Sequence, residues 1–242
     1  MKKISFFFII LLLILCNSLF AQNFSIGIKD GMNWSTINGN TENIEISKLQ
    51  GENFGLILNY KITGYLSLQT EINIEEKGVK FNSVWCGGGY YGKYELKYFT
   101  IPLLANFEFG KSVKYYGYLG FYLSLLASAD NQTIVTSTAS PEFKRYDYSH
   151  DAKDEFKKNE MGAIVGVGIK IPLCDRVKFL FETRYNIGLC NSADITEYKA
   201  GSYDRSIFTP DNFQNVYNRS ISINLGIIYN FKKRSKNVLS NE

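Results

Sequence analysis

Apolar and polar residues alternate over several long stretches of this chain, most regularly near its C-terminus. In residues 221–231 an apolar side chain occupies every second position, and the positions between hold Ser, Asn and Gly, with Ile228 as the only apolar exception. Successive side chains of a strand point to opposite faces of a sheet, so this period of two indicates a strand with one apolar face. Residues 177–189, 66–77 and 162–171 repeat the pattern. The chain is therefore predicted to be all-β, with two chemically different faces on its sheet.

Four less regular segments bring the predicted number of strands to eight. They are residues 24–34, 52–60, 95–107 and 115–127, and each has about the 9–11 residues that a tilted strand needs to cross a bilayer. Strands can cross a membrane only as a closed barrel, because lipid cannot satisfy the backbone groups of an open edge. We therefore predict a transmembrane, antiparallel, up-and-down β-barrel of about eight strands, with ten as the alternative count.

The lengths of the predicted connections alternate as well. Those after the second, fourth and sixth strands are short, and the others are long (61–64, 108–114 and 172–176 against 35–51, 79–94, 128–159 and 191–216). Outer-membrane barrels have short periplasmic turns and long external loops. The same arrangement is predicted here, with both chain ends on the periplasmic side.

Two residues conflict with regular strands. Asp30 would face lipid in an unbroken first strand, so we expect a β-bulge near Gly31. Pro102 has no backbone N–H and would remove a ladder hydrogen bond from a sheet without edges. A second bulge is expected there.

The first 22 residues have the pattern of a secretory signal peptide. Lysines at positions 2 and 3 precede an apolar run over 5–15, and Ala21 stands at a cleavage position. A retained anchor is disfavoured because the run is shorter than the roughly 20 residues of a spanning helix. A lipoprotein attached at Cys16 is disfavoured because the preceding Leu15 is not small. The predicted segments are a signal peptide (1–22), the barrel domain (23–231) and a short polar periplasmic tail (232–242).

Composition and motifs argue against several functions. Removal of the two leader lysines lowers the net charge from +4 to +2, which gives no reason to expect nucleic acid as a partner. Cys86, Cys174 and Cys190 match no metal or redox spacing, and the sequence leaves open a disulfide between Cys86 and Cys190 or free thiols. Phosphate-binding loops and paired catalytic carboxylates are also not found. We therefore expect no catalytic residues, no cofactor and no metal.

The last strand carries a second signal. Its residues Asn224, Gly226, Tyr229 and Phe231 follow the polar-x-Gly-x-x-aromatic-x-aromatic pattern of the C-terminal assembly signal of outer-membrane barrels. The assembly machinery recognises such a strand by pairing with its edge. Here eleven residues follow Phe231, whereas that strand usually ends the chain. Recognition by the barrel assembly machinery is predicted.

Four further motifs are Gly27 to Trp34 (GIKDGMNW), Leu68 to Gly78 (LQTE through EKG), Tyr98 to Leu104 (YFTIPLL) and the FAQ that ends the leader. Together with the closing strand, they resemble the PorT-like outer-membrane β-barrel proteins of Bacteroidetes-type bacteria. The resemblance covers roughly the whole mature chain and implies a barrel in the outer membrane. One branch of that family is linked to secretion and gliding machinery, and most members have no assigned activity. The motifs do not select a branch.

Seven charged residues belong to the face that would point into the barrel. They are Lys29, Glu71, Glu75, Lys77, Lys170, Glu182 and Arg184. Side chains fill the interior of a small barrel, and charges buried there must pair. We predict a network of ion pairs that closes the barrel. A narrow, gated pore is the alternative.

The predicted loop 128–159 contains the only histidine, His150, between Ser149 and Asp151. Nucleophilic catalysis needs three side chains that converge on a rigid frame, and adjacent loop residues point apart. The loop is either a solvated segment or a contact surface for a partner or for lipopolysaccharide. The leading hypothesis is a non-enzymatic structural or interaction role for a barrel that sits in outer-membrane lipid and presents its external loops. Passive transport, a lipid-acting enzyme and an accessory role in secretion or gliding are alternatives.

Overall fold

The structure is a computed structural model that describes residues 23–40, 44–85, 87–137, 144–192 and 214–231. The predicted signal peptide, the tail and Cys86 lie outside these residues. The described chain forms nine strands and a short 3-10 helix: β1 (Phe24–Asn40), β2 (Glu45–Lys61), β3 (Leu66–Trp85), β4 (Gly88–Phe109), β5 (Lys114–Ser137), β6 (Lys144–Asp151), η2 (Lys153–Glu155), β7 (Asn159–Pro172), β8 (Val177–Gly188) and β9 (Gln214–Asn230). None of the helices within these ranges has the length and apolar character needed to traverse a bilayer.

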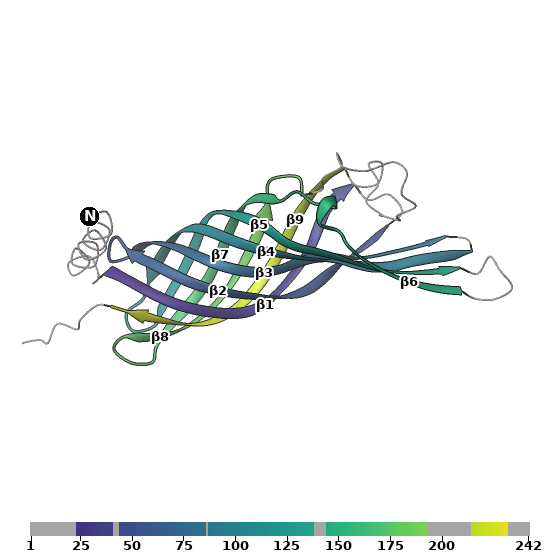
Figure 1. The fold of residues 1–242 in the computed structure, drawn as a ribbon. Helices are drawn as coiled ribbons and strands as arrows, with labels where there is room; N and C mark the ends of the chain where they lie inside the picture. Colours follow the sequence, from purple (N-terminus) through teal and green to yellow (C-terminus); the bar gives the residue numbers. More distant parts are fainter. Residues whose placement is uncertain (1–22, 41–43, 86, 138–143, 193–213, 232–242) are drawn as a thin grey trace, which may run out of the picture.

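Eight of the strands close into a barrel (Figure 1). The ring runs β1, β2, β3, β4, β5, β7, β8 and β9, and β9 pairs with β1 to complete it. Every neighbouring pair in the ring is antiparallel. The predicted all-β, up-and-down barrel of eight strands is therefore confirmed. The ninth strand, β6, pairs with β5 and stands outside the ring.

The two faces of the barrel differ as the alternation predicts. Large apolar side chains cover the outer face and remain exposed, and along β5 they run from Tyr115 to Leu125. This length matches the roughly 9–11 tilted residues that cross a bilayer. The inner face buries charged and amide side chains together with a layer of large apolar ones (Ile57, Leu104, Tyr116, Tyr118, Tyr122, Ile164, Leu180 and Ile228). The polar residues of each strand thus face the lumen.

Three tyrosines of β5 fill the lumen because glycines on β7 leave room for them. Tyr118 is paired with Gly166, and Tyr122 is paired with Gly162. A Cβ atom added to either glycine would lie 2.3 Å from the tyrosine ring opposite. Tyr116 is paired with Gly168 in the same way. The alternation in β5 is therefore obscured in the sequence, because both of its faces carry large apolar groups.

The predicted external loops are largely strand, which corrects the prediction for three of them. β3 and β4 continue through 79–94, β5 and β6 occupy most of 128–159, and β1 and β2 extend into 35–51. The fourth loop, 191–216, lies mostly outside the described residues. The extensions of β3, β4 and β5 project together with β6 from one end of the barrel as a long arm of paired strands, which we call the outer arm (Figure 1). They escaped detection because much of their length lies outside lipid, so alternation is no longer required.

The opposite end of the barrel carries the short turns, and we call it the inner end. The connections 62–65, 110–113 and 173–176 are located there, as are Phe24 and Phe231, which are joined by a backbone hydrogen bond of 3.2 Å. The short turns are as predicted.

Both predicted bulges are wrong. β1 keeps an unbroken register past Gly31 with β2 and with β9, and Asp30 faces outward beside Phe54. Pro102 pairs with Tyr122 in an unshifted part of β4. The carbonyl of Pro102 accepts a hydrogen bond of 2.9 Å from the hydroxyl of Thr70 on the neighbouring strand β3. The irregularity in the β4–β5 ladder lies between Lys97 and Tyr98.

Candidate functional site

A cluster of four charged side chains occupies the middle of the lumen. Lys29 Nζ lies 2.6 Å from Glu71 and 3.1 Å from Glu182. The Arg184 guanidinium donates two hydrogen bonds of 3.0 Å to the two oxygens of Glu71 and one of 2.6 Å to Glu182. All four side chains are completely buried. Two cations and two carboxylates from β1, β3 and β8 therefore form a neutral cluster, which we call the central network.

Neutral side chains complete the hydrogen bonding of the central network. The carboxylates accept bonds from the Gln69 and Asn73 amides, at 2.6 and 2.9 Å, and from the Tyr116 hydroxyl, at 2.9 Å. The Tyr118 hydroxyl accepts a bond of 3.2 Å from Arg184 Nε. Buried ion pairs offset their desolvation only when geometry is good and the remaining lone pairs are satisfied. The central network meets both conditions.

A second cluster lies nearer the opposite end of the barrel, which we call the outer end. Lys77 Nζ is 3.3 Å from both Glu75 and Glu160, and its ammonium lies over the rings of Tyr98 and Tyr122. The cluster holds one cation and two carboxylates. Glu160 also accepts hydrogen bonds from the Tyr122 hydroxyl and the Asn218 amide.

An apolar cluster lies in the barrel beyond Lys77. It includes Tyr94, Leu96, Ala152 and Phe156, which are at most 3% exposed. The connection from β6 to β7 reaches this cluster because backbone hydrogen bonds hold it against β5, from Ala152 N to Ala129 O and from Leu126 N to Lys158 O, both at 2.8 Å. The outer end is therefore covered by the chain itself.

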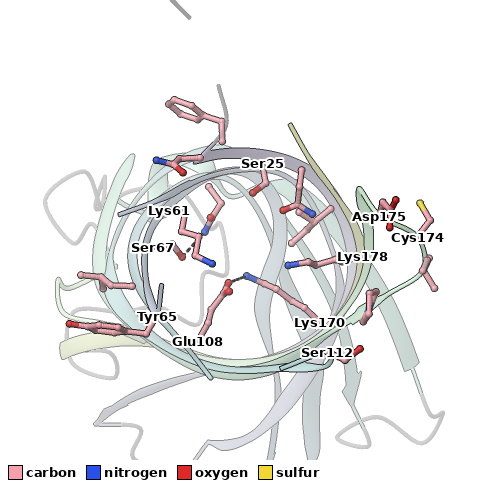
Figure 2. A pocket seen from close by; sticks show the side chains of 18 residues that line it. Ser25, Lys61, Tyr65, Ser67, Glu108, Ser112, Lys170, Cys174, Asp175 and Lys178 are labelled. Atoms are coloured by element: carbon pink, nitrogen blue, oxygen red, sulfur yellow. Dashed lines mark hydrogen bonds and ion pairs between the residues drawn. The ribbon is translucent and has the colours of Figure 1, made fainter. Parts of the chain in front are cut away.

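The inner end opens into a cavity of about 680 Å³ (Figure 2). Lys61, Lys170 and Lys178 project into it from β2, β7 and β8. Lys170 pairs with Glu108 at 2.5 Å, and its ammonium lies over the Tyr116 ring. We call this cavity the vestibule.

All seven luminal charges that the sequence singles out lie in the barrel interior. The structure brings Lys29, Glu71, Glu182 and Arg184 together, places Glu75 with Lys77, and leaves Lys170 separate at the inner end. Two luminal carboxylates were missed, Glu108 and Glu160. Glu108 lies two residues after Asn106, and Glu160 lies two residues before Gly162, so both occupy positions that point into the lumen. Longer predicted strands would have included them.

His150 forms no triad with its sequence neighbours. Its Nε2 lies 2.8 Å from Glu155, and Asp151 accepts a hydrogen bond from the Lys153 backbone N–H instead. Ser149 and His150 are consecutive residues of β6, so they point to opposite faces. Within the described ranges, His, Cys, Asp and Glu side chains form no group that could hold a metal ion. Cys174 and Cys190 are free thiols.

The residues of the predicted assembly signal have contacts within the barrel. Asn224 faces the lumen and donates a hydrogen bond of 3.3 Å to Glu182. Gly226 lets β9 approach β1, because an added Cβ would lie 2.5 Å from the Ile28 carbonyl oxygen. Tyr229 and Phe231 pack edge to face at the inner end, with ring centroids 5.3 Å apart. Their recognition by an assembly machinery stays a prediction.

A family model described as "Outer membrane protein beta-barrel domain" matches residues 20–194. Among solved structures, the chain is similar to the outer membrane protein OprG from Pseudomonas aeruginosa, with 11% identity, 86% of this chain and 96% of that chain covered, and a TM-score of 0.50. It is also similar to Neisserial surface protein A, with 15% identity, 85% and 96% coverage, and a TM-score of 0.42. The search of curated proteins found no significant match. Identities this low bear on the fold alone.

Proposed function

Because the chain belongs to the outer membrane protein beta-barrel domain family, we propose that it is a closed, non-enzymatic barrel that anchors an outer arm in the outer membrane. Its role in this proposal is structural or interactive rather than transport. The proposal treats the arm as external and the inner end as periplasmic, in keeping with the long and short connections of such barrels.

The burial of the luminal side chains is the observation that supports a closed lumen and carries this proposal. The side chains of the central network have no exposed surface, and the apolar cluster around Phe156 covers the outer end above them. An eight-stranded barrel has an interior just wide enough for side chains to fill. Ion passage would require several buried ion pairs to separate at once.

The outer arm is the part of the molecule best placed for an interaction. β6 pairs only with β5 within the described residues, and its side chains are almost all exposed, including Tyr146 and Tyr148. Tyrosine is enriched in binding surfaces because its ring combines apolar area with a polar group. A protein of the envelope or lipopolysaccharide would be the partner.

Export and assembly complete the proposal. Residues 1–22 would direct the chain across the inner membrane as a cleaved signal peptide, and β9 would then be recognised by the barrel assembly machinery. The narrower assignment to the PorT-like group rests on its sequence motifs, and a role in secretion or gliding would follow only from that assignment.

A narrow pore is the second candidate, and one observation favours it. Several luminal polar atoms have no hydrogen-bond partner among the described residues, including Asn73 Oδ1 and Glu75 Oε1. Buried polar atoms are normally bonded to protein or to ordered water. Water along the lumen would satisfy these atoms and could support a small conductance.

Conductance in planar lipid bilayers separates the two candidates. The refolded mature chain should show no sustained openings. A charge-balanced variant, Glu71→Ala with Arg184→Ala, removes one carboxylate and one cation together and should conduct. Sustained openings of the wild-type protein would refute the closed barrel and support the pore. A silent double variant that still folds, judged by a heat-modifiable band on a gel, would mean that the central network is not the barrier.

A further inference from the structure

We propose that the vestibule at the inner end of the barrel binds an anion of the phosphate class, as free phosphate or as the phosphate of a lipid headgroup. The site is formed by the ammonium groups of Lys61, Lys170 and Lys178. This goes beyond a structural or interaction role for the outer arm and does not depend on it.

The three ammonium groups converge although they come from separate strands. Lys61 ends β2, Lys170 is near the end of β7, and Lys178 is near the start of β8. Their side chains follow the lumen-facing parity of these strands and point toward the centre of the cavity (Figure 2). Lysines at a bilayer interface ordinarily extend outward to reach water and headgroups. The inward direction requires another explanation.

Of the three lysines, one has an acidic partner among the described residues. Glu108 pairs with Lys170, whereas the side chains of Lys61 and Lys178 form no ion pair or hydrogen bond with any residue that the structure describes. Asp175 also borders the cavity, but it lies on the β7–β8 turn outside the ring of strands (Figure 2). Three cations therefore face one carboxylate in a confined space, and a bound anion would balance them.

The vestibule is a blind cavity rather than the start of a channel. Ile228 forms part of its wall, and Leu104, Leu180 and Tyr116 are buried in the same apolar layer above it. Beyond that layer lies the central network, which is neutral and completely buried. An anion that enters from the inner end would therefore be held among the lysines.

Lysine is a suitable residue for binding phosphate. The planar fork of arginine suits carboxylate and phosphate alike, and lysine binds phosphate as a point charge with three donors. Arg176, two residues before Lys178, is exposed and donates a hydrogen bond of 3.0 Å to the Tyr229 hydroxyl. A volume of about 680 Å³ also leaves room for a group attached to the phosphate.

The test compares the wild-type protein with a double variant that carries both Lys61→Ala and Lys178→Ala. The mature chain is refolded in maltoside micelles, which contain no phosphate, and inorganic phosphate is titrated by calorimetry. Phosphate should bind the wild-type protein, and the double variant should bind at least about tenfold more weakly because two of the three cations are lost. The arginine pair, Lys61→Arg with Lys178→Arg, keeps both charges and should retain binding.

A second measurement distinguishes the two sources of phosphate. Native mass spectrometry in the same micelles compares phosphatidylglycerol with diacylglycerol, which lacks the phosphate. Retention of phosphatidylglycerol alone, lost in the alanine variant, assigns a lipid headgroup, and calorimetric binding without lipid retention assigns the free anion.

The matched control is Lys157→Ala with Lys158→Ala, two exposed lysines at the outer end. It should bind like the wild-type protein. Three results would overturn the proposal. The folded Lys61/Lys178 alanine variant could bind phosphate as well as the wild-type protein, or the outer control could lose as much binding as that variant. The third result is that the wild-type protein binds neither inorganic phosphate nor phosphatidylglycerol. None of these results would bear on closure of the lumen, which conductance measures separately.

Discussion

Replacement of Glu71 by glutamine tests whether the central network is a dry, tightly paired plug. The substitution preserves the size of the side chain and removes one negative charge. Glu71 accepts hydrogen bonds from Lys29, from Arg184 through both of its oxygens, and from two neighbouring amides. After the change, Lys29 and Arg184 would share Glu182 alone, and the glutamine NH₂ would face donors.

The expected loss of stability follows from the complete burial of these groups. Removing one partner of a buried ion pair leaves an uncompensated buried charge and destabilises a protein by about 3–5 kcal/mol. With an m-value of about 3 kcal/mol/M in guanidinium chloride, this corresponds to a decrease of about 1–2 M in the unfolding midpoint. Lys29→Met in addition to Glu71→Gln should recover part of the loss, because two opposite charges are then removed together.

The assay is guanidinium unfolding of the barrel in lipid vesicles, followed by tryptophan fluorescence. Glu76→Gln on the same strand is the matched control. Glu76 lies 3.0 Å from Lys97, and both side chains are more than a third exposed. An exposed pair contributes about 0–1 kcal/mol. Equal effects of Glu71→Gln and Glu76→Gln would refute the dry plug and indicate that water reaches the central network.

Three further predictions concern other parts of the barrel. Gly226→Ala should lower the free energy of unfolding by about 1–3 kcal/mol, because its Cβ would meet the backbone of β1, whereas Gly64→Ala, with no atom within 4 Å of the added Cβ, should be nearly neutral in the same assay. Val167→Arg should lower the free energy of unfolding in vesicles by about 2–4 kcal/mol, because this exposed side chain would face the middle of the bilayer. Val84→Arg on the outer arm should have little effect on it, and equal losses of stability would contradict the assigned lipid band. Phe156→Ala should destabilise the apolar cluster at the outer end by about 3–5 kcal/mol and speed hydrogen exchange in residues 152–158, and unchanged exchange there would show that this segment does not depend on the cluster.

The sequence predicts much of the barrel because each strand must face lipid on one side. Lipid tolerates apolar side chains and the lumen tolerates polar ones, so the alternation in strands such as 221–231 reveals both the strand and its inward face. The same parity identifies Glu71, Glu182 and Arg184 as luminal before their neighbours are known. The alternation of apolar and polar residues is less clear in β5, because Tyr116, Tyr118 and Tyr122 place large rings in the lumen.

The outer arm was not predicted for a related reason. β6 and the outer parts of β3, β4 and β5 lie beyond the apolar band, where both faces of a strand can be polar. A strand of this kind has the composition of a loop. Only pairing with a neighbouring strand distinguishes it, as for residues 144–151 against 130–137.

The sequence by itself therefore determined the class of fold, the faces of the regular strands and seven of the charges in the lumen, because these follow from the local requirement that lipid imposes on each residue. The tertiary structure decided which charges meet. Lys29 contacts Glu182 across 153 positions of sequence, and the convergence of Lys61, Lys170 and Lys178 depends on barrel closure (Figure 2). Parity assigns a side chain to the lumen, whereas its height and its partner depend on register and strand tilt, which are properties of the whole closed sheet.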